Sequence, residues 1–137
     1  MVHALQEANR VLKQGGVLID LRPAPVHRRV GIEVHGDFRF VAKLNEKFDE
    51  DHAADRAVVE VIHEGILKPQ ARLRFDCKRV MGSRKDFHLW MDDFVMTAGL
   101  PSQESLLQKV QLAYKSTFGR KRIVVRAPLI LRVLQKI

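Results

Sequence analysis

Cysteine is nearly absent from this sequence of 137 residues, in which Cys77 is the only one. A single cysteine cannot form an internal disulfide, and it excludes metal and redox sites of the CxxC type. Free cysteines are usually buried and inert, so we expect Cys77 to be a core residue. No serine lies in a G-x-S-x-G context, and the sequence therefore contains no recognisable catalytic nucleophile.

Long apolar runs are also absent. No stretch approaches the roughly 18 residues that cross a bilayer, and no apolar segment follows a basic one at the start of the chain. We therefore expect a cytoplasmic protein with no membrane partner. Hydrophobic residues make up 46% of the chain and charged residues 29%, which is typical of a globular protein. The length predicts a single domain that covers residues 1–137.

The eight glycines are scattered, and no G-x-G-x-x-G or G-x-G-x-G occurs. Loops of that kind let the backbone approach a nucleotide closely. We therefore expect this chain to bind no nucleotide cofactor on its own.

Metal ligands and paired acids also lack a suitable spacing. His52 and His63 are eleven residues apart on one predicted helix, about three turns, so they are poorly placed to share an ion. Asp92 and Asp93 are adjacent helix positions whose side chains diverge by about 100°. We expect neither a metal site nor a catalytic pair of carboxylates.

Positive charge is in excess, because 24 Lys and Arg residues stand against 16 Asp and Glu, for a formal net charge of +8. This balance supports one hypothesis, a basic binding module for nucleic acid or an acidic partner. A nucleic-acid site also needs its cations on one face, preferably beside exposed aromatic rings. Trp90 and Tyr114 fall on apolar stripes of predicted helices, and we expect both in the core.

Hydrophobic periodicity predicts an α/β or α+β fold, with a small mixed sheet, flanking helices and a β-hairpin. Alternating apolar residues on both sides of His35-Gly36-Asp37 predict that hairpin, with one face exposed to solvent. Pro23 is expected to close the first strand, Pro69 to stop the second helix and Pro128 to interrupt the last strand. Helices are predicted over residues 4–13, 49–67, 83–99 and 102–117, and strands over 17–21, 29–42 (the hairpin), 72–80 and 123–134.

The segment Glu7–Asp20 reads EANRVLKQGGVLID, in which a helix ends at paired glycines and passes directly into an apolar strand. It resembles the E-x-x-R-V-L-K-P-G-G motif and following strand of class I S-adenosylmethionine-dependent methyltransferases, of the type 11-like group. Gln14 stands where that family often has proline. In the family this motif follows the cofactor-binding half, so the chain resembles the C-terminal part of a Rossmann-like methyltransferase fold, with the hairpin as an insertion.

The resemblance implies a final strand inserted antiparallel beside its neighbours. It also implies that S-adenosylmethionine is held by a glycine-rich loop after the family's first strand and by an acidic residue ending the second. This sequence begins after both elements, so we expect that cofactor to bind only if an N-terminal half is supplied.

We therefore expect a methyltransferase-like protein, truncated or degenerate, that is not catalytic alone and acts through self-association or through a partner chain completing the sheet. The strand Val17–Leu21 would be central in a complete sheet, and an uncovered strand of this kind is an aggregation hazard. We therefore expect a homodimer whose interface buries the first helix and this strand.

Three residues are candidates for lining a pocket or contacting a ligand. Asp20, Arg22 and His27 lie at or just beyond the carboxyl end of the first strand, where α/β sheets place ligand-binding groups. The alternative is that they are ordinary loop or surface residues. A further hypothesis is a small enzyme with its pocket near Asp20 and Arg22, unrelated to methyl transfer.

Overall fold

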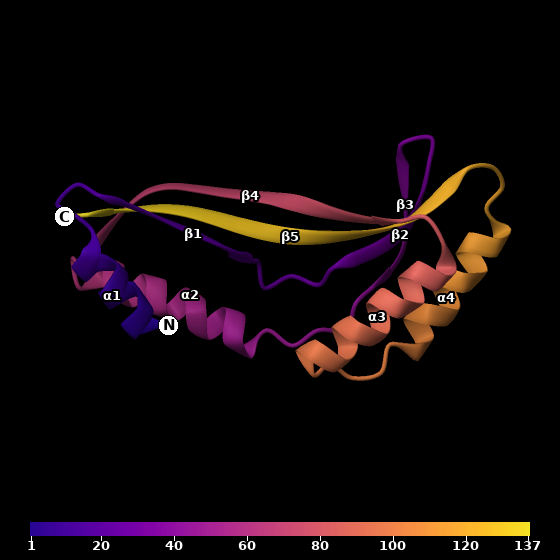
Figure 1. Cartoon of the computed structure of the whole chain (residues 1–137), viewed down its shortest axis with the longest axis horizontal. Coiled ribbons are helices and arrows are strands. Elements are labelled where there is room, and N and C mark those ends of the chain that lie inside the picture. The colour runs from indigo at the N-terminus through magenta and orange to yellow at the C-terminus, as the bar shows by residue number, and fades with distance from the viewer. The chain divides into compact units, whose positions relative to one another are not determined.

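The computed structural model describes all 137 residues and contains four helices and five strands (Figure 1). In chain order these are α1 (Val2–Val11), β1 (Val17–Pro23), β2 (Arg29–Val34), β3 (Asp37–Lys43), α2 (Asp49–His63), β4 (Leu67–Met81), α3 (Arg84–Ala98), α4 (Glu104–Ser116) and β5 (Lys121–Lys136). The strands pair antiparallel, and the expected mixed class of helices and sheet is confirmed. None of the four helices has the length and apolar character needed to span a membrane.

The chain divides into two compact units. The first contains residues 1–26, 48–75 and 128–137, and the second contains residues 27–47 and 76–127. Each unit has its own apolar cluster of buried side chains. Strands β4 and β5 contribute residues to both units.

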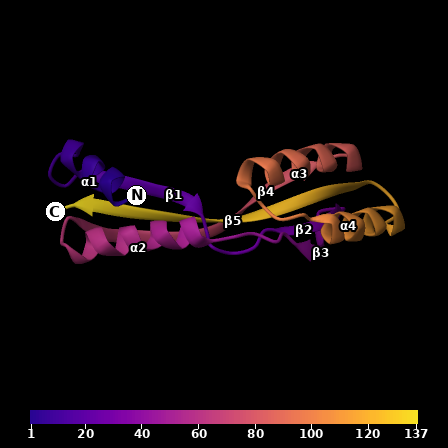
Figure 2. The same ribbon diagram turned by 90° about the horizontal axis from the view of Figure 1, so that it is seen from below.

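In the first unit, α1 and α2 cover one face of the paired strands β1 and β5. Figure 1 shows both helices on one side of these strands, and Figure 2 shows them flanking the line of β5. Each helix packs its apolar side against the sheet and exposes its polar side to solvent, as amphipathic surface helices do. The buried side chains of this core are Leu5, Ala57, Val58, Val61, Leu67 and Leu134.

In the second unit, α3 and α4 pack on one face of a sheet in which β2 lies between β3 and β5, while β4 also pairs with β5. Trp90 and Tyr114 pack against this core but are only partly buried, so the expectation for both rings is confirmed in part. The fully buried side chains of the core include Ile32, Phe87, Met91, Val110 and Ile123.

The predicted hairpin is confirmed, and its turn consists of His35 and Gly36. Their φ angles are 50° and 83°, the left-handed conformation that a two-residue hairpin turn requires. Glycine adopts it without steric cost.

A β-bulge decides which face the β3 side chains occupy. Val41 is the extra residue, and the pairing is therefore Phe40 with Gly31 and Phe38 with Glu33. Both phenylalanines consequently lie on the face of the sheet opposite α3 and α4. The prediction that the hairpin has one solvent-exposed face is wrong. Strand β2 is buried on both faces, while the two phenylalanine rings of β3 point outward.

The end of α2 differs from the prediction. The helix was expected to continue to Leu67 and stop at Pro69, but it ends at His63, and Gly65 takes a left-handed φ of 70°. This glycine, rather than the proline, ends the helix. Pro69 instead lies near the start of β4, which pairs only with β5 and so tolerates a residue without an N–H.

Two prolines were expected to end or interrupt strands, and only the first of them does so. Pro23 is the last residue of β1 and pairs with Leu129. Strand β5 runs through Pro128 without a break, but its partner changes there: residues up to Arg126 pair with β2, and residues from Leu129 onward pair with β1. The proline therefore marks a change of neighbour instead of a break.

Strand β4 is longer and more exposed than predicted. Between its buried end residues Leu67 and Met81 every side chain is exposed, including Leu73 and Phe75. The expectation that Cys77 is a core residue is wrong, because its strand has one neighbour and neither face is covered at this position.

Candidate functional site

Asp20 and Arg22, two of the predicted site residues, belong to an ion cluster in the first unit. Arg22 donates to Asp20 through Nε at 2.7 Å and Nη2 at 2.9 Å, a bidentate pair. Arg132 of β5 donates to Asp20 at 3.2 Å and to Asp55 of α2 at 2.8 Å. Arg22 also reaches Asp55 at 3.2 Å, which closes the cluster. The cluster therefore ties α2 to both strands.

Burial and charge balance give this cluster a structural role. Asp20 is 8% exposed, and the two guanidinium groups neutralise the two carboxylates. The hydrogen bonds from Arg22 to Asp20 raise the pKa of the arginine above its ordinary value. Loss of one member would leave the other three partnered but with one unbalanced charge. Both carboxylates accept hydrogen bonds from the two arginines.

His27, the third predicted residue, lies in the second unit. Its Nδ1 is 2.8 Å from the carbonyl oxygen of Leu44 and 3.4 Å from the backbone nitrogen of Glu46. The structure thus brings Asp20 and Arg22 together and places His27 in a separate network. A ligand-binding role for the three residues stays a prediction.

The first unit has a second feature, an uncovered sheet face. Val17, Ile19 and Leu21 of β1 are 50%, 63% and 53% exposed, and they alternate with the residues that face α2. Their neighbours on β5 are Val133, opposite Ile19, and Leu131, opposite Leu21. We call these five residues the apolar sheet face. Because β1 pairs only with β5, its other edge has unpaired backbone groups.

Sequence reasoning missed a buried carboxylate in the second unit. Glu33 of β2 is 3% exposed, and it accepts hydrogen bonds from Arg122 of β5 and from Lys78 of β4, the latter at 3.1 Å. These bonds lower the pKa of Glu33 below its ordinary value. A glutamate inside the apolar run of residues 30–34 was the available signal, but its partners are far away in sequence.

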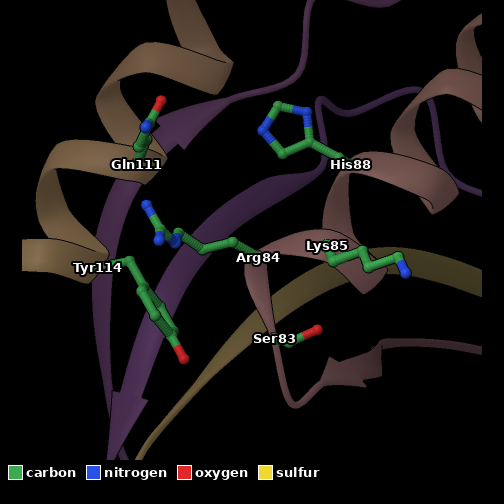
Figure 3. Close-up of a pocket in the computed structure, with 6 residues that line it drawn as sticks. All are labelled: Ser83, Arg84, Lys85, His88, Gln111 and Tyr114. Atoms are coloured by element: carbon green, nitrogen blue, oxygen red, sulfur yellow. The ribbon is translucent and has the colours of Figure 1, made fainter.

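A hollow of about 480 Å³ opens at the start of α3 (Figure 3). The guanidinium carbon of Arg84 is 5.8 Å from the centre of the Tyr114 ring, and Figure 3 shows this arginine extending toward that ring while Lys85 points away. Ser83 Oγ accepts a hydrogen bond from the backbone N–H of Asp86 and so caps the helix. Arg84, Lys85 and His88, which line this hollow, are exposed.

The residues present do not fit S-adenosylmethionine. The side chains at the carboxyl half of β1 bind each other in the ion cluster. The glycines with left-handed φ lie in separate turns, at positions 15, 36, 65, 99 and 119, instead of in one loop. No step of a methyl transfer can be assigned to this chain.

Comparisons with known protein families, with curated proteins and with solved structures found no match to the chain.

Proposed function

We propose that this chain is a methyltransferase-like protein of the cytoplasm that is not catalytic alone and works by associating with a second copy of itself. The observation that carries the proposal is the apolar sheet face on an unpaired edge strand. Ile19 is the most exposed of the three apolar residues on this face of β1, although its neighbours Leu18 and Asp20 are partly buried and buried, respectively.

Both the backbone and the side chains of β1 favour association. An exposed edge strand can pair with a strand of another molecule through its free N–H and C=O groups. Burying the half-exposed side chains of Val17, Ile19 and Leu21 would contribute on the order of 1 kcal/mol each. Val11 at the end of α1 is 68% exposed and offers further apolar surface in the same unit.

The strand order supports the methyltransferase part of the proposal. Strand β5 pairs with both β1 and β4, and its pairing with β1 is antiparallel. The family resemblance of the segment Glu7–Asp20 implies this placement of a final strand between its neighbours. The strand order therefore supports the proposal beside the motif.

The test is a charge placed on the apolar sheet face. The unmodified protein is expected to be a dimer at micromolar concentration, and Ile19→Lys is expected to shift it to monomer, because the interface would bury an unpaired ammonium group. Light scattering coupled to gel filtration measures the mass of each.

Val59→Lys is the matched control, because Val59 on α2 is 64% exposed, close to the 63% of Ile19. This variant should retain the mass of the unmodified protein. A monomeric unmodified protein, or an equal loss of association in both variants, would contradict the proposal.

A further inference from the structure

The positive charge of the chain is concentrated in the second unit. This unit contains fifteen Lys and Arg and eight Asp and Glu, a formal net charge of +7, whereas the first contains nine and eight, a net charge of +1. A domain with such an excess attracts polyanions. The sequence showed the total charge, and the fold shows which unit contains it.

The strand register gathers part of this charge on the sheet face opposite α3 and α4, which we call the basic sheet face. Directly paired residues of antiparallel strands point to the same side. The register therefore forms three rows across β3, β2 and β5. They are Lys43, Arg29 and Arg126; Phe40, Gly31 and Val124; and Phe38, Glu33 and Arg122.

Aromatic rings and guanidinium groups are stacked on this face. The Phe38 ring lies over Gly31, where an added Cβ would come within 2.6 Å of it. The guanidinium carbon of Arg126 is 4.1 Å from the centre of the same ring, in cation–π contact. Phe40, in the next row, is 54% exposed, so its ring is accessible to a partner.

The acids on this face are already neutralised by neighbouring cations. Glu33 accepts hydrogen bonds from Lys78 and Arg122, whose side chains are 47% and 52% exposed. Asp76 accepts from Arg29 at 2.6 Å. The five cations of the face, counting Lys43 and Arg126, outnumber these two carboxylates. A hollow of about 250 Å³, lined in part by His35, Arg120 and Arg122, adjoins Glu33.

We propose that the basic sheet face binds single-stranded nucleic acid. A base stacks on the exposed ring of Phe40, and the phosphates contact Lys43, Lys78 and Arg122. Proteins that bind single strands combine accessible aromatic rings with a basic surface in this way. An acidic peptide would need the cations but would gain little from the ring. The proposal lies beyond the proposed self-association, because none of its residues lies on β1 and its partner is not a second copy of the chain.

The test measures fluorescence anisotropy of a labelled, mixed-sequence single-stranded RNA of about 12 nucleotides, with DNA of the same sequence in parallel. Phe40→Ala is expected to weaken binding about tenfold, and Phe40→Trp is expected to retain it, because stacking needs only a ring. Phe118→Ala is the control, since Phe118 is 91% exposed and absent from the three rows. Circular dichroism verifies that each variant is folded.

Salt dependence tests the phosphate contacts. Lys43→Ala should lower the slope of log K against log salt by about 0.7, whereas Lys115→Ala, at an exposed position in the last turn of α4, should leave it unchanged. Three outcomes would overturn the proposal: no binding at low salt to either nucleic acid, equal losses in the Phe40 and Phe118 variants, or displacement by polyglutamate with no effect of Phe40→Ala. The last would assign the surface to acidic protein partners.

Discussion

Glu33 is almost fully buried and is nevertheless held in its ionised form. Arg122 and Lys78 lower its pKa, chiefly by donating hydrogen bonds to the carboxylate, with their positive charges adding to the effect. The carboxylate joins β2 to β5 and to β4, so its protonation would weaken contacts between three strands. The ion cluster around Asp20 likewise joins three elements, β1, β5 and α2.

This pKa shift predicts a pH dependence of stability. A carboxyl group whose folded pKa lies below the ordinary 4.5 stabilises the fold above that pH, and the contribution is lost as the pH falls through the folded value. Glu33→Gln should therefore lower the free energy of unfolding at neutral pH, and its stability should fall less steeply below pH 4.5. Urea unfolding at a series of pH values measures both effects.

Glu104→Gln provides the comparison, because Glu104 is exposed at the first turn of α4. It should leave the acid limb of the stability curve nearly unchanged. A Glu33→Gln protein with the same acid limb as the unmodified one would show that the ion pairs contribute no stability.

At the scale of elements, strand pairing explains why glycine is needed at the centre of β2. A Cβ at Gly31 would lie 2.4 Å from the carbonyl oxygen of Arg39 and 2.6 Å from the Phe38 ring. The first of these atoms belongs to the backbone of β3 and cannot move without disturbing the bulged pairing. The glycine therefore allows the hairpin strands to approach and lets the ring lie flat on the sheet.

Gly31→Ala should destabilise the protein by about 1–3 kcal/mol, because the extra methyl group overpacks the contact between β2 and β3. Thermal unfolding followed by circular dichroism measures the change. Gly82→Ala is the matched substitution, since a Cβ there meets nothing within 4 Å and its φ is not left-handed. Equal melting temperatures for the Gly31 variant and the unmodified protein would argue against the tight contact.

At the scale of the whole molecule, the two units carry different surfaces. The first has the apolar sheet face and nearly balanced charge, and the second has the basic sheet face and almost all of the net charge. Strands β4 and β5 contribute residues to both units. That residues 1–137 behave as one domain stays a prediction.

Calorimetry with S-adenosylmethionine tests the expectation that this chain does not bind the cofactor alone. We expect no heat of binding, because the polar groups of β1 are engaged in the ion cluster and no loop gathers several glycines. Circular dichroism of the same sample verifies that the protein is folded. A saturable heat at one cofactor per chain would refute the expectation.

Local features of the fold could be predicted from the sequence because they depend on residues close together in the chain. Ser83 caps α3 and Gly99 ends it, and His35 and Gly36 form the hairpin turn where the pattern placed it. The placement of Trp90 and Tyr114 against the core followed from helical spacing alone. In each case the determining interactions lie within about one helical turn or one strand.

Only the tertiary structure decided which residues from distant parts of the sequence contact each other. Asp20 meets Arg132 across 112 positions of sequence, and Glu33 meets Arg122 across 89. The exposure of Cys77 and the outward position of Phe40 depend on which strand lies beside each, and on a bulge that shifts the register by one residue. Such a shift moves side chains from one face of a sheet to the other, and periodicity within a single strand contains no information about it.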